Sequence, residues 1–404
     1  MLNIQRGRRD FVISLVGRAV STFGDWVAVV ALTLRLQADG AQPYEVALLL
    51  AAGTIPLLLL ARPVGRLVDS HDSKRLLVGF GLVEVAATVP LIFLHAVAPI
   101  VILVAVLGAT ASVTAATWSA LVPRIVGEDR IAQAISAQQS LSTLVLVAAP
   151  AVGGLLAGAF GAGVALAVDA GTFVVVTLAA ALIRTRRVPE RTPRADTPSD
   201  ARSGFALVRA DRVLAPLVAG VALVVLLVGM VDVVLVYLVR VTLDAGGVWF
   251  GVAQAAWMLG MVAGALGAGR IGAEGGRIRA TVAGAGVACA GVVGMAVSPG
   301  VGILILVSVL GGVGNGYASA CLSTLLMSRT PDSARGRVSA AANAIFGTAQ
   351  GASLLFGGLV AIVLSPRAIY AVGGLLGLAA TGVVAVASAS RTSSPASPLD
   401  ASTG

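Results

Sequence analysis

The chain is poor in charged residues, and this excludes an ordinary soluble protein. Only 12% of its 404 residues are charged, against roughly 25% in a typical soluble domain. It is 57% hydrophobic, with a mean hydropathy of +0.96. Apolar runs of about 20 residues, long enough to cross a bilayer as helices, alternate with short charged clusters. A soluble fold would need a core larger than one domain supports, so we expect an all-α integral membrane protein.

Lysine, cysteine and histidine are also scarce. Lys74 stands alone beside 27 arginines, which with the excess of alanine, glycine and valine is typical of a GC-rich bacterial genome. Cys289 and Cys321 lie inside apolar runs, which indicates buried thiols. The two histidines have no cysteine or carboxylate at metal-ligand spacing, and no glycine-rich phosphate loop follows a strand. We therefore expect no catalytic residue, metal or cofactor, and no enzyme.

The apolar runs predict twelve membrane-spanning helices. Arg6, Arg8 and Arg9 precede the first run, Phe11–Leu36, which is too long for the apolar region of a cleaved signal peptide. With twelve spans, 24 of the 28 lysine and arginine residues fall on one side, so the positive-inside rule predicts cytoplasmic termini in a bacterial inner membrane. The net charge of +9 thus reflects orientation rather than nucleic-acid binding. The predicted helices are 11–36, 44–64, 75–97, 99–122, 131–159, 161–183, 213–241, 247–269, 278–297, 299–328, 336–362 and 366–389.

Composition divides the chain into four parts. Residues 184–212 contain eight arginines and several prolines, which predicts a flexible cytoplasmic linker. The linker separates an N-terminal bundle of six helices, 1–183, from a C-terminal bundle, 213–389. Residues 390–404 are rich in serine and proline, and we expect a disordered cytoplasmic tail.

The two halves repeat. Arg35 and Asp39 recur as Arg240 and Asp244 at an offset of 205, and Arg130 recurs as Arg337 at an offset of 207. The segment Gly65-Arg66-Leu67 recurs as Gly269-Arg270-Ile271, at an offset of 204. Ala273 stands where the first half has Asp69, so we expect acidic contacts only in the first loop. Parallel six-helix repeats are a known plan for transporters.

A charged segment between the second and third apolar runs resembles the loop signature of the major facilitator superfamily. Gly65, Leu67, Asp69, Lys74 and Leu77 match that signature, whereas Val68, Ser70, Asp72 and Ser73 depart from it. The resemblance implies two pseudo-symmetric six-helix bundles and a conformational role for Gly65, Asp69, Lys74 and Arg75. We expect Asp69 to accept hydrogen bonds from a helix start or to pair with an arginine of the other half.

Further segments resemble the siderophore-exporter and macrolide-efflux branch of that superfamily. Ala149-Pro150-Ala151-Val152-Gly153-Gly154 resembles the antiporter motif, with the functional positions at Pro150, Gly153 and Gly154, and it implies export. Unlike many proton–drug antiporters, the chain has no arginine in its fourth predicted helix. The other matching segments are Gly24-Asp25-Trp26, Leu121-Val122-Pro123, Glu128-Asp129-Arg130 and Arg335-Gly336-Arg337-Val338.

Charged residues inside the spans are the candidate site. A charge at mid-bilayer costs at least about 2.5–3.5 kcal/mol on insertion scales, so each needs a partner or an aqueous cavity. Ser14, Arg18, Ser21 and Asp25 share one face of the first helix, which indicates either a buried hydrogen-bonded seam or, as we favour, a cavity lining. The candidates for proton coupling and substrate binding are Asp25, Arg18, Asp232, Glu84 and Asp169.

These features predict a secondary active transporter that exports a lipophilic or amphipathic small molecule by alternating access, coupled to protons. The expected partners are a small-molecule substrate, protons and membrane lipid, with no nucleic acid and with a monomeric chain. Two alternatives remain open, which are a metabolite importer of the same fold and a membrane receptor or scaffold that transports nothing.

Overall fold

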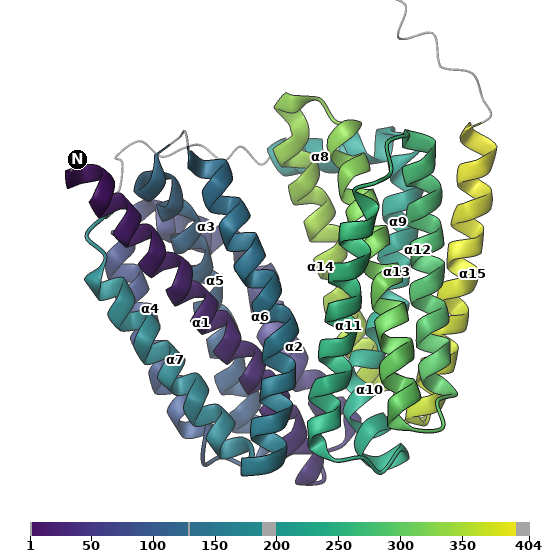
Figure 1. Cartoon of the computed structure of the whole chain (residues 1–404), viewed down its shortest axis with the longest axis horizontal. Coiled ribbons are helices and arrows are strands. Elements are labelled where there is room, and N and C mark those ends of the chain that lie inside the picture. The colour runs from purple at the N-terminus through teal and green to yellow at the C-terminus, as the bar shows by residue number, and fades with distance from the viewer. Residues whose placement is uncertain (1, 128–129, 188–198, 393–404) are drawn as a thin grey trace, which may run out of the picture. The chain divides into compact units, whose positions relative to one another are not determined.

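The computed structural model describes residues 2–127, 130–187 and 199–392, and within them it contains helices and no strand (Figure 1). The all-α prediction is therefore confirmed. The chain forms two compact units. The first comprises residues 1–195, 232–256 and 354–366, and the second comprises residues 196–231, 257–353 and 367–404.

Seven helices of the first unit come from the N-terminal half of the chain. α1 packs against α6 and α7, α4 packs against α5 and α7, and α2 packs against α5. Apolar side chains of α1, such as Val27 and Ala31, are fully buried in the core of this unit. The helices are α1 (Leu2–Ala38), α2 (Pro43–Leu59), α3 (Ala61–Ser70), α4 (Ser73–Leu91), α5 (Val97–Val126), α6 (Ile131–Phe160) and α7 (Ala162–Leu182).

Later parts of the chain complete both units. The first unit also takes α10 (Val231–Tyr237) from Asp232 onward, the π-helix η2 (Leu238–Thr242), the start of α11 (Gly247–Ala268) and the end of α14 (Arg335–Val360). The second unit holds the rest of α11 and α14, with the short η3 (Asp332–Ala334). Its other helices are α8 (Ser199–Ala210), α9 (Leu214–Gly229), α12 (Glu274–Ala296), α13 (Val301–Ser328) and α15 (Pro366–Thr392).

The helices are long and apolar enough to cross a membrane many times. Among the described residues, nine segments qualify singly, and the bent pair α2 and α3 adds a tenth. α4 and α14 also reach spanning length, with 19 and 26 residues. Their apolarity is lower because α4 carries Lys74, Arg75 and Glu84, and because α14 carries two arginines with amide and hydroxyl side chains. With these two, the helices match the twelve predicted spans.

The segment predicted as a charged turn is mostly helical. α3 continues to Ser70, so Gly65 and Asp69 lie on a helix and only His71 and Asp72 form the turn into α4. The single helix expected over 44–64 is instead bent by 57° between α2 and α3. Pro56 lies one turn before this bend, and proline removes a backbone hydrogen bond and crowds the preceding turn.

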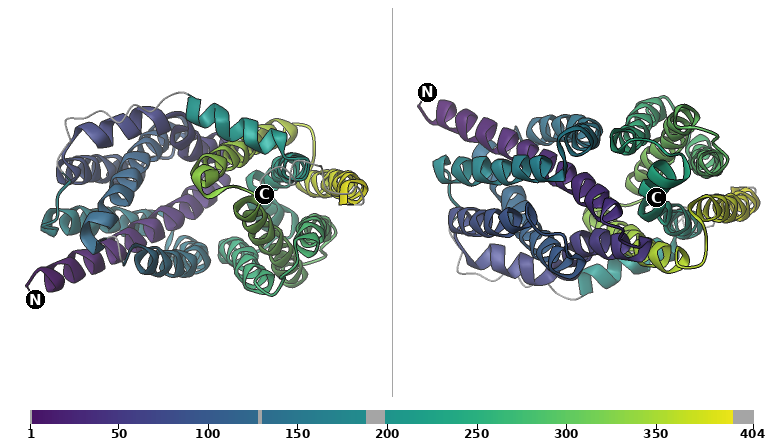
Figure 2. Two further views of the ribbon diagram at one scale, coloured as in Figure 1. Left: turned by 90° about the horizontal axis from the view of Figure 1, so that it is seen from above. Right: turned by 90° about the horizontal axis from the view of Figure 1, so that it is seen from below.

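The linker prediction is wrong over its second half. Ser199–Ala210 form α8, which Figure 2 shows lying flat across the end of its unit while neighbouring helices are seen end on. Val208 is buried with residues of α9, α13 and α14. A Cβ at Gly204 would lie 2.3 Å from the Arg337 carbonyl oxygen, so glycine permits this close approach. Residues 188–198, Glu128, Asp129 and the tail after Thr392 lie outside the described residues.

Arg35 ties two helices of the first unit together. Its side chain is 8% exposed. Its guanidinium donates to the carbonyl oxygens of Leu91 at 2.6 Å, Leu94 at 3.1 Å and Ile92 at 3.1 Å. These carbonyl groups belong to the last residue of α4 and to residues just after it. There the backbone has no helical partner, and the helix dipole favours a cation. The arginine of the repeated Arg-x3-Asp pattern therefore serves as a helix cap in the first half.

Replacing Arg35 with leucine will lower the stability of the detergent-solubilised protein by about 2–3 kcal/mol, because it leaves buried carbonyl groups without their charged donor. Thermal unfolding monitored by circular dichroism measures the effect. Arg62→Leu, at an exposed position on α3, is the matched control and should change the melting temperature little. Equal shifts for the two variants would contradict the capping role.

Candidate functional site

Three carboxyl groups from three helices meet inside the first unit. Asp25 lies on α1, Glu84 on α4 and Asp169 on α7. They interact electrostatically with one another. Glu84 and Asp169 are buried, with exposures of 3% and 1%, whereas Asp25 is only partly buried. The sequence identified each residue separately, and the fold brings these three together.

Gly24 lets the α7 carboxyl approach α1. A Cβ at Gly24 would lie 2.4 Å from Asp169 Oδ1 and 2.2 Å from Thr172 Oγ1, so no larger residue fits without displacing them. The Thr172 hydroxyl donates to the Asp169 backbone carbonyl at 2.7 Å. Gly24, the residue before Asp25, therefore leaves space for the Asp169 carboxyl beside α1.

Glu84 is held by hydroxyl groups of α5. Thr114 Oγ1 donates to Glu84 Oε1 at 3.3 Å, and Thr110 also interacts with this carboxyl. Thr88, one turn along α4, donates to the Glu84 backbone carbonyl at 2.9 Å. The partners of the Glu84 carboxyl are therefore threonines.

Arg18 is bound by an amide of α6. When the Gln138 side-chain oxygen faces the guanidinium, it accepts from the two terminal nitrogens of Arg18 at 2.6 and 3.0 Å. Ser14, which begins the polar face of α1, is buried and donates to the Phe11 carbonyl at 2.8 Å. The proposed cavity lining is therefore limited to Arg18, Ser21 and Asp25, which are partly exposed.

Asp232 lies at a break in the span Leu214–Thr242. α9 ends at Gly229, and Asp232 falls in the first turn of α10, where its side chain is exposed. The sequence predicted one continuous helix over 213–241. A discontinuous helix near mid-membrane is a common feature of transporter sites. The position of Asp232 at this break fits its candidate role in proton coupling or substrate binding.

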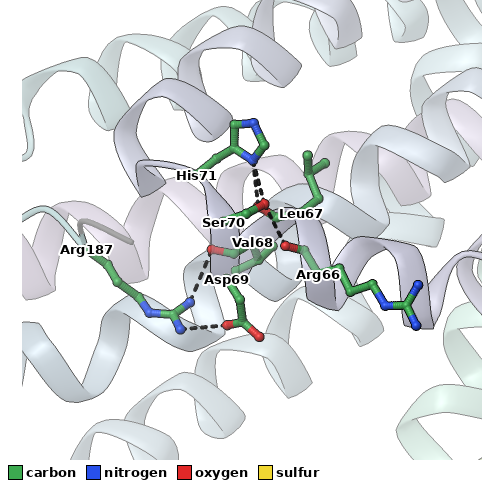
Figure 3. Close-up of polar contacts among 7 residues, drawn as sticks. All are labelled: Arg66, Leu67, Val68, Asp69, Ser70, His71 and Arg187. Carbon is green, nitrogen blue, oxygen red and sulfur yellow. Dashed lines mark hydrogen bonds and ion pairs between the residues drawn. The ribbon is translucent and has the colours of Figure 1, made fainter. Parts of the chain in front are cut away.

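Asp69 forms an ion pair with an arginine that the sequence grouped with the linker. Figure 3 shows Arg187 reaching the end of α3, where it donates to Asp69 Oδ1 at 2.6 Å and to the Val68 carbonyl at 3.3 Å. Arg187 belongs to the same unit and follows α7. In the part of the chain that the structure describes, the ion-pair partner of Asp69 is therefore an arginine of its own half.

The rest of the conformational motif ties α4 to the end of α7. Asp72 caps α4 by accepting from the backbone N–H groups of Lys74 and Arg75 at 2.9 and 3.0 Å, as aspartate commonly does. The Lys74 ammonium donates to the carbonyl oxygens of Ala181 and Ile183. The Arg75 side chain is exposed, and a Cβ at Gly65 would meet nothing within 4 Å.

The segment after α7 is also fixed to α1. Asp10, which is 3% exposed, accepts from the backbone N–H of Arg184 at 3.2 Å, from that of Thr185 at 2.9 Å and from the Thr185 hydroxyl at 2.7 Å. Ser73 and Arg187 exchange two hydrogen bonds. The sequence analysis missed this role of Asp10, although a carboxylate near the end of a span is the signal that marks it.

The second unit makes an acidic contact that the sequence analysis excluded. Glu274, next to Ala273, pairs with Arg329, which also donates to Asp211 Oδ2 at 2.9 Å. Burial by itself would raise the pKa of Asp211. The hydrogen bond from Arg329 and those from the backbone N–H groups of Leu214 and Val213 outweigh burial, so this pKa lies below its usual value. Arg329 thus joins the start of α12 to the start of α9.

The antiporter-like motif marks two close helix contacts in the first unit. A Cβ at Gly153 would lie 3.0 Å from Val27 Cα on α1, and one at Gly154 would lie 2.8 Å from Gly251 Cα on α11. Pro150 contributes its carbonyl oxygen to the same contact, 2.2 Å from a Cβ built on Gly251. Small residues let membrane helices approach this closely.

The described part of the chain contains no group of histidine, cysteine or carboxylate residues that fits a metal ion. Cys289 and Cys321 are free and buried thiols, as predicted. What the geometry does provide is a group of acidic and hydroxyl side chains inside a membrane-spanning bundle. Proton exchange and the binding of a small molecule are the chemistry that such groups support.

Comparisons with known proteins agree with this geometry. The chain is similar over 203 residues to macrolide efflux protein A of Streptococcus pyogenes, at 23% identity, covering 48% of the chain and 50% of that protein. An MFS-type transporter of Bacillus subtilis, YfiS, is 23% identical over 169 residues, covering 42% of the chain and 40% of that protein. The chain thus spans about half the length of the curated relatives it matches.

Solved transporters share the fold. The nucleoside transporter NupG gives a TM-score of 0.71 at 11% identity, covering 95% of the chain and 98% of its own. A bacterial homologue of the lysosomal transporter Spinster, in an inward-facing conformation, gives 0.72 at 14% identity, covering 97% and 99%. The family model of the Major Facilitator Superfamily matches residues 14–347, and this multi-pass membrane chain, a transporter and not an enzyme, belongs to that superfamily.

Proposed function

We propose that the chain exports a lipophilic or amphipathic small molecule across the bacterial inner membrane, in exchange for protons, as a monomer surrounded by membrane lipid. The meeting of Asp25, Glu84 and Asp169 carries this proposal. Three carboxylates in an apolar interior repel one another, so the group can hold protons and release them when its surroundings change. The efflux proteins among the relatives support the outward direction.

Asp25 is the member that exchanges protons and meets the substrate. It interacts with both of the other carboxyl groups, and as a residue it is partly exposed, whereas Glu84 and Asp169 are buried. A carboxylate beside apolar side chains suits an amphipathic cargo, and the threonines at Glu84 and Asp169 stabilise those carboxyl groups by hydrogen bonds. Asp232 and Arg18 are secondary candidates for the same cavity.

The opposite direction is the second candidate. The solved structures of similar fold include transporters named for nucleosides and peptides, and the fold by itself does not fix the direction. An assay that compares macrolide efflux with uptake in the same vesicles separates export from import. Uptake driven by the pH gradient, without efflux, would favour the importer.

Asp25→Asn will abolish export driven by a pH gradient in proteoliposomes, because the amide cannot bind and release a proton. Insertion and downhill flux should persist, since asparagine has nearly the same shape. Macrolide flux is measured with and without the gradient. The matched control is Asp332→Asn, which removes an exposed carboxyl. Uphill export by Asp25→Asn would assign coupling to Glu84 or Asp169 instead.

The pair of Asp69 and Arg187 sets the rate of the conformational change. Its side chains are 58% and 26% exposed, so the pair contributes only about 0–1 kcal/mol to stability. Asp69→Asn should therefore slow transport several-fold without loss of folded protein. The double variant Asp69→Arg with Arg187→Asp should recover part of the rate. The exposed pair of Arg335 and Asp332 provides the control, and equal rates for Asp69→Asn and the unmodified chain would refute this role.

Both termini and residues 184–212, which the sequence predicted as a linker, lie in the cytoplasm. Val363, in the turn between α14 and α15, is 84% exposed and lies on the opposite side of the predicted layout. A membrane-impermeant maleimide added to intact cells should label Val363→Cys and leave Ala195→Cys unlabelled until the cells are opened. The reverse pattern would invert the proposed orientation.

A further inference from the structure

The first half of α6 carries a row of polar side chains that no step above uses. Gln133, Ser136, Ser140 and Thr143 follow one another at intervals of three or four residues, so they share one face of the helix. We call them the α6 polar face. The first three are exposed and Thr143 is partly exposed. Lipid provides no hydrogen-bond partner for an exposed amide such as that of Gln133, which favours contact of this face with water or a ligand.

Helix geometry gives the direction of the α6 polar face. Gly154 follows Ser136 by 18 residues, and Gly158 follows Ser140 by the same number. At 3.6 residues per turn this is about five turns, so each pair points the same way. A Cβ at Gly154 would lie 2.8 Å from Gly251 Cα, and one at Gly158 would lie 2.9 Å from Val248 N, both on α11. The α6 polar face therefore lies on the same side of α6 as the two glycines that pack against α11.

The hydrogen bonds of this face leave acceptors pointing outward. Ser140 Oγ donates to the Ser136 carbonyl at 3.0 Å, and Thr143 Oγ1 donates to the Gln139 carbonyl at 2.8 Å. Each hydroxyl proton is used within the helix, and the oxygen keeps lone pairs for a ligand. Leu144, one turn beyond Ser140 on the same side, is 64% exposed. The surface changes from hydrogen-bonding to apolar at that point.

The internal repeat places amides at corresponding positions of α14. At the offset of 207 that relates Arg130 to Arg337, Ser136 corresponds to Asn343 and Thr143 to Gln350. Asn343 is exposed. Two of the four polar positions thus recur in a second spanning helix, whereas Gln133 and Ser140 correspond to Ala340 and Gly347. The recurrence favours a ligand-facing role for Ser136 and Thr143.

We propose that the α6 polar face binds the hydrogen-bond-donating head of an amphipathic substrate, with hydroxyl or N–H groups, while the apolar body of the substrate lies over Leu144. The inference rests on the proposed function, because it assigns the cargo of that transporter. Recognition of the substrate head by the α6 polar face is distinct from proton exchange at Asp25. The two roles can therefore be tested separately.

Cysteine accessibility tests the direction of the face without any transport. Ser136→Cys and Ser140→Cys are each made in a chain with alanine at positions 289 and 321, and are exposed to a charged methanethiosulfonate in open membrane fragments. Ser142→Cys, on the opposite side of α6, is the control. We expect rapid modification at 136 and 140, and little at 142. Modification at 136 and 140 no faster than at 142 would overturn the proposal, whatever the chain transports.

Equilibrium binding tests the assignment to substrate. Ser136→Ala combined with Thr143→Val should raise the Kd of erythromycin, a hydroxyl-rich macrolide, by about 2- to 10-fold, as expected for the loss of one hydrogen bond. Ser142→Ala should leave it unchanged, and erythromycin should slow the modification of Ser140→Cys. An unchanged Kd in the double variant would overturn the substrate role. Binding without uphill export by the unmodified chain would instead count against the proposed function.

Discussion

The membrane interior offers no hydrogen-bond partner, and the structure depends on how the chain meets that constraint. Every polar group inside a span must find a partner within the protein. Arg35 does so by taking three carbonyl oxygens at the end of α4. Asp169 and Glu84 do so through threonine hydroxyls. Where a polar side chain is exposed on a spanning helix instead, its exposure indicates an aqueous path or a ligand.

Close helix packing is the second consequence of the same constraint. Lipid is as apolar as leucine, so the hydrophobic effect does little to hold spanning helices together, and packing and hydrogen bonds must do so. Glycine provides the close approach between α6 and α11 at Gly154 and Gly251. Gly24 in the first unit also allows a close approach, but there the missing side chain leaves room for the Asp169 carboxyl. One residue type thus serves both stability and the placement of charge.

Sequence patterns predicted most of the fold because the hydrophobic signal of a spanning helix extends over about 20 residues. They failed where the signal is short or local. The bend after Pro56, the break after Gly229 and the end of α3 at Ser70 each involve only a few residues. α8 was missed because its arginines and the prolines that precede it resemble a flexible linker, although Gly204 and Val208, four residues apart, form the face that it buries.

The candidate site was predicted residue by residue, but its assembly was not. Burial cost alone marks Asp25, Glu84 and Asp169 as unusual, whereas their meeting depends on how α1, α4 and α7 pack. Partners such as Arg187 and Gln138 lie 118 and 120 positions from the residues they bind, and no local pattern reports contacts at such separation. Asp10 and the α6 polar face were missed for a different reason. Their sequence signals, a carboxylate near the end of a span and hydroxyl groups at helical spacing, are common, and their burial or exposure in the fold is what sets them apart.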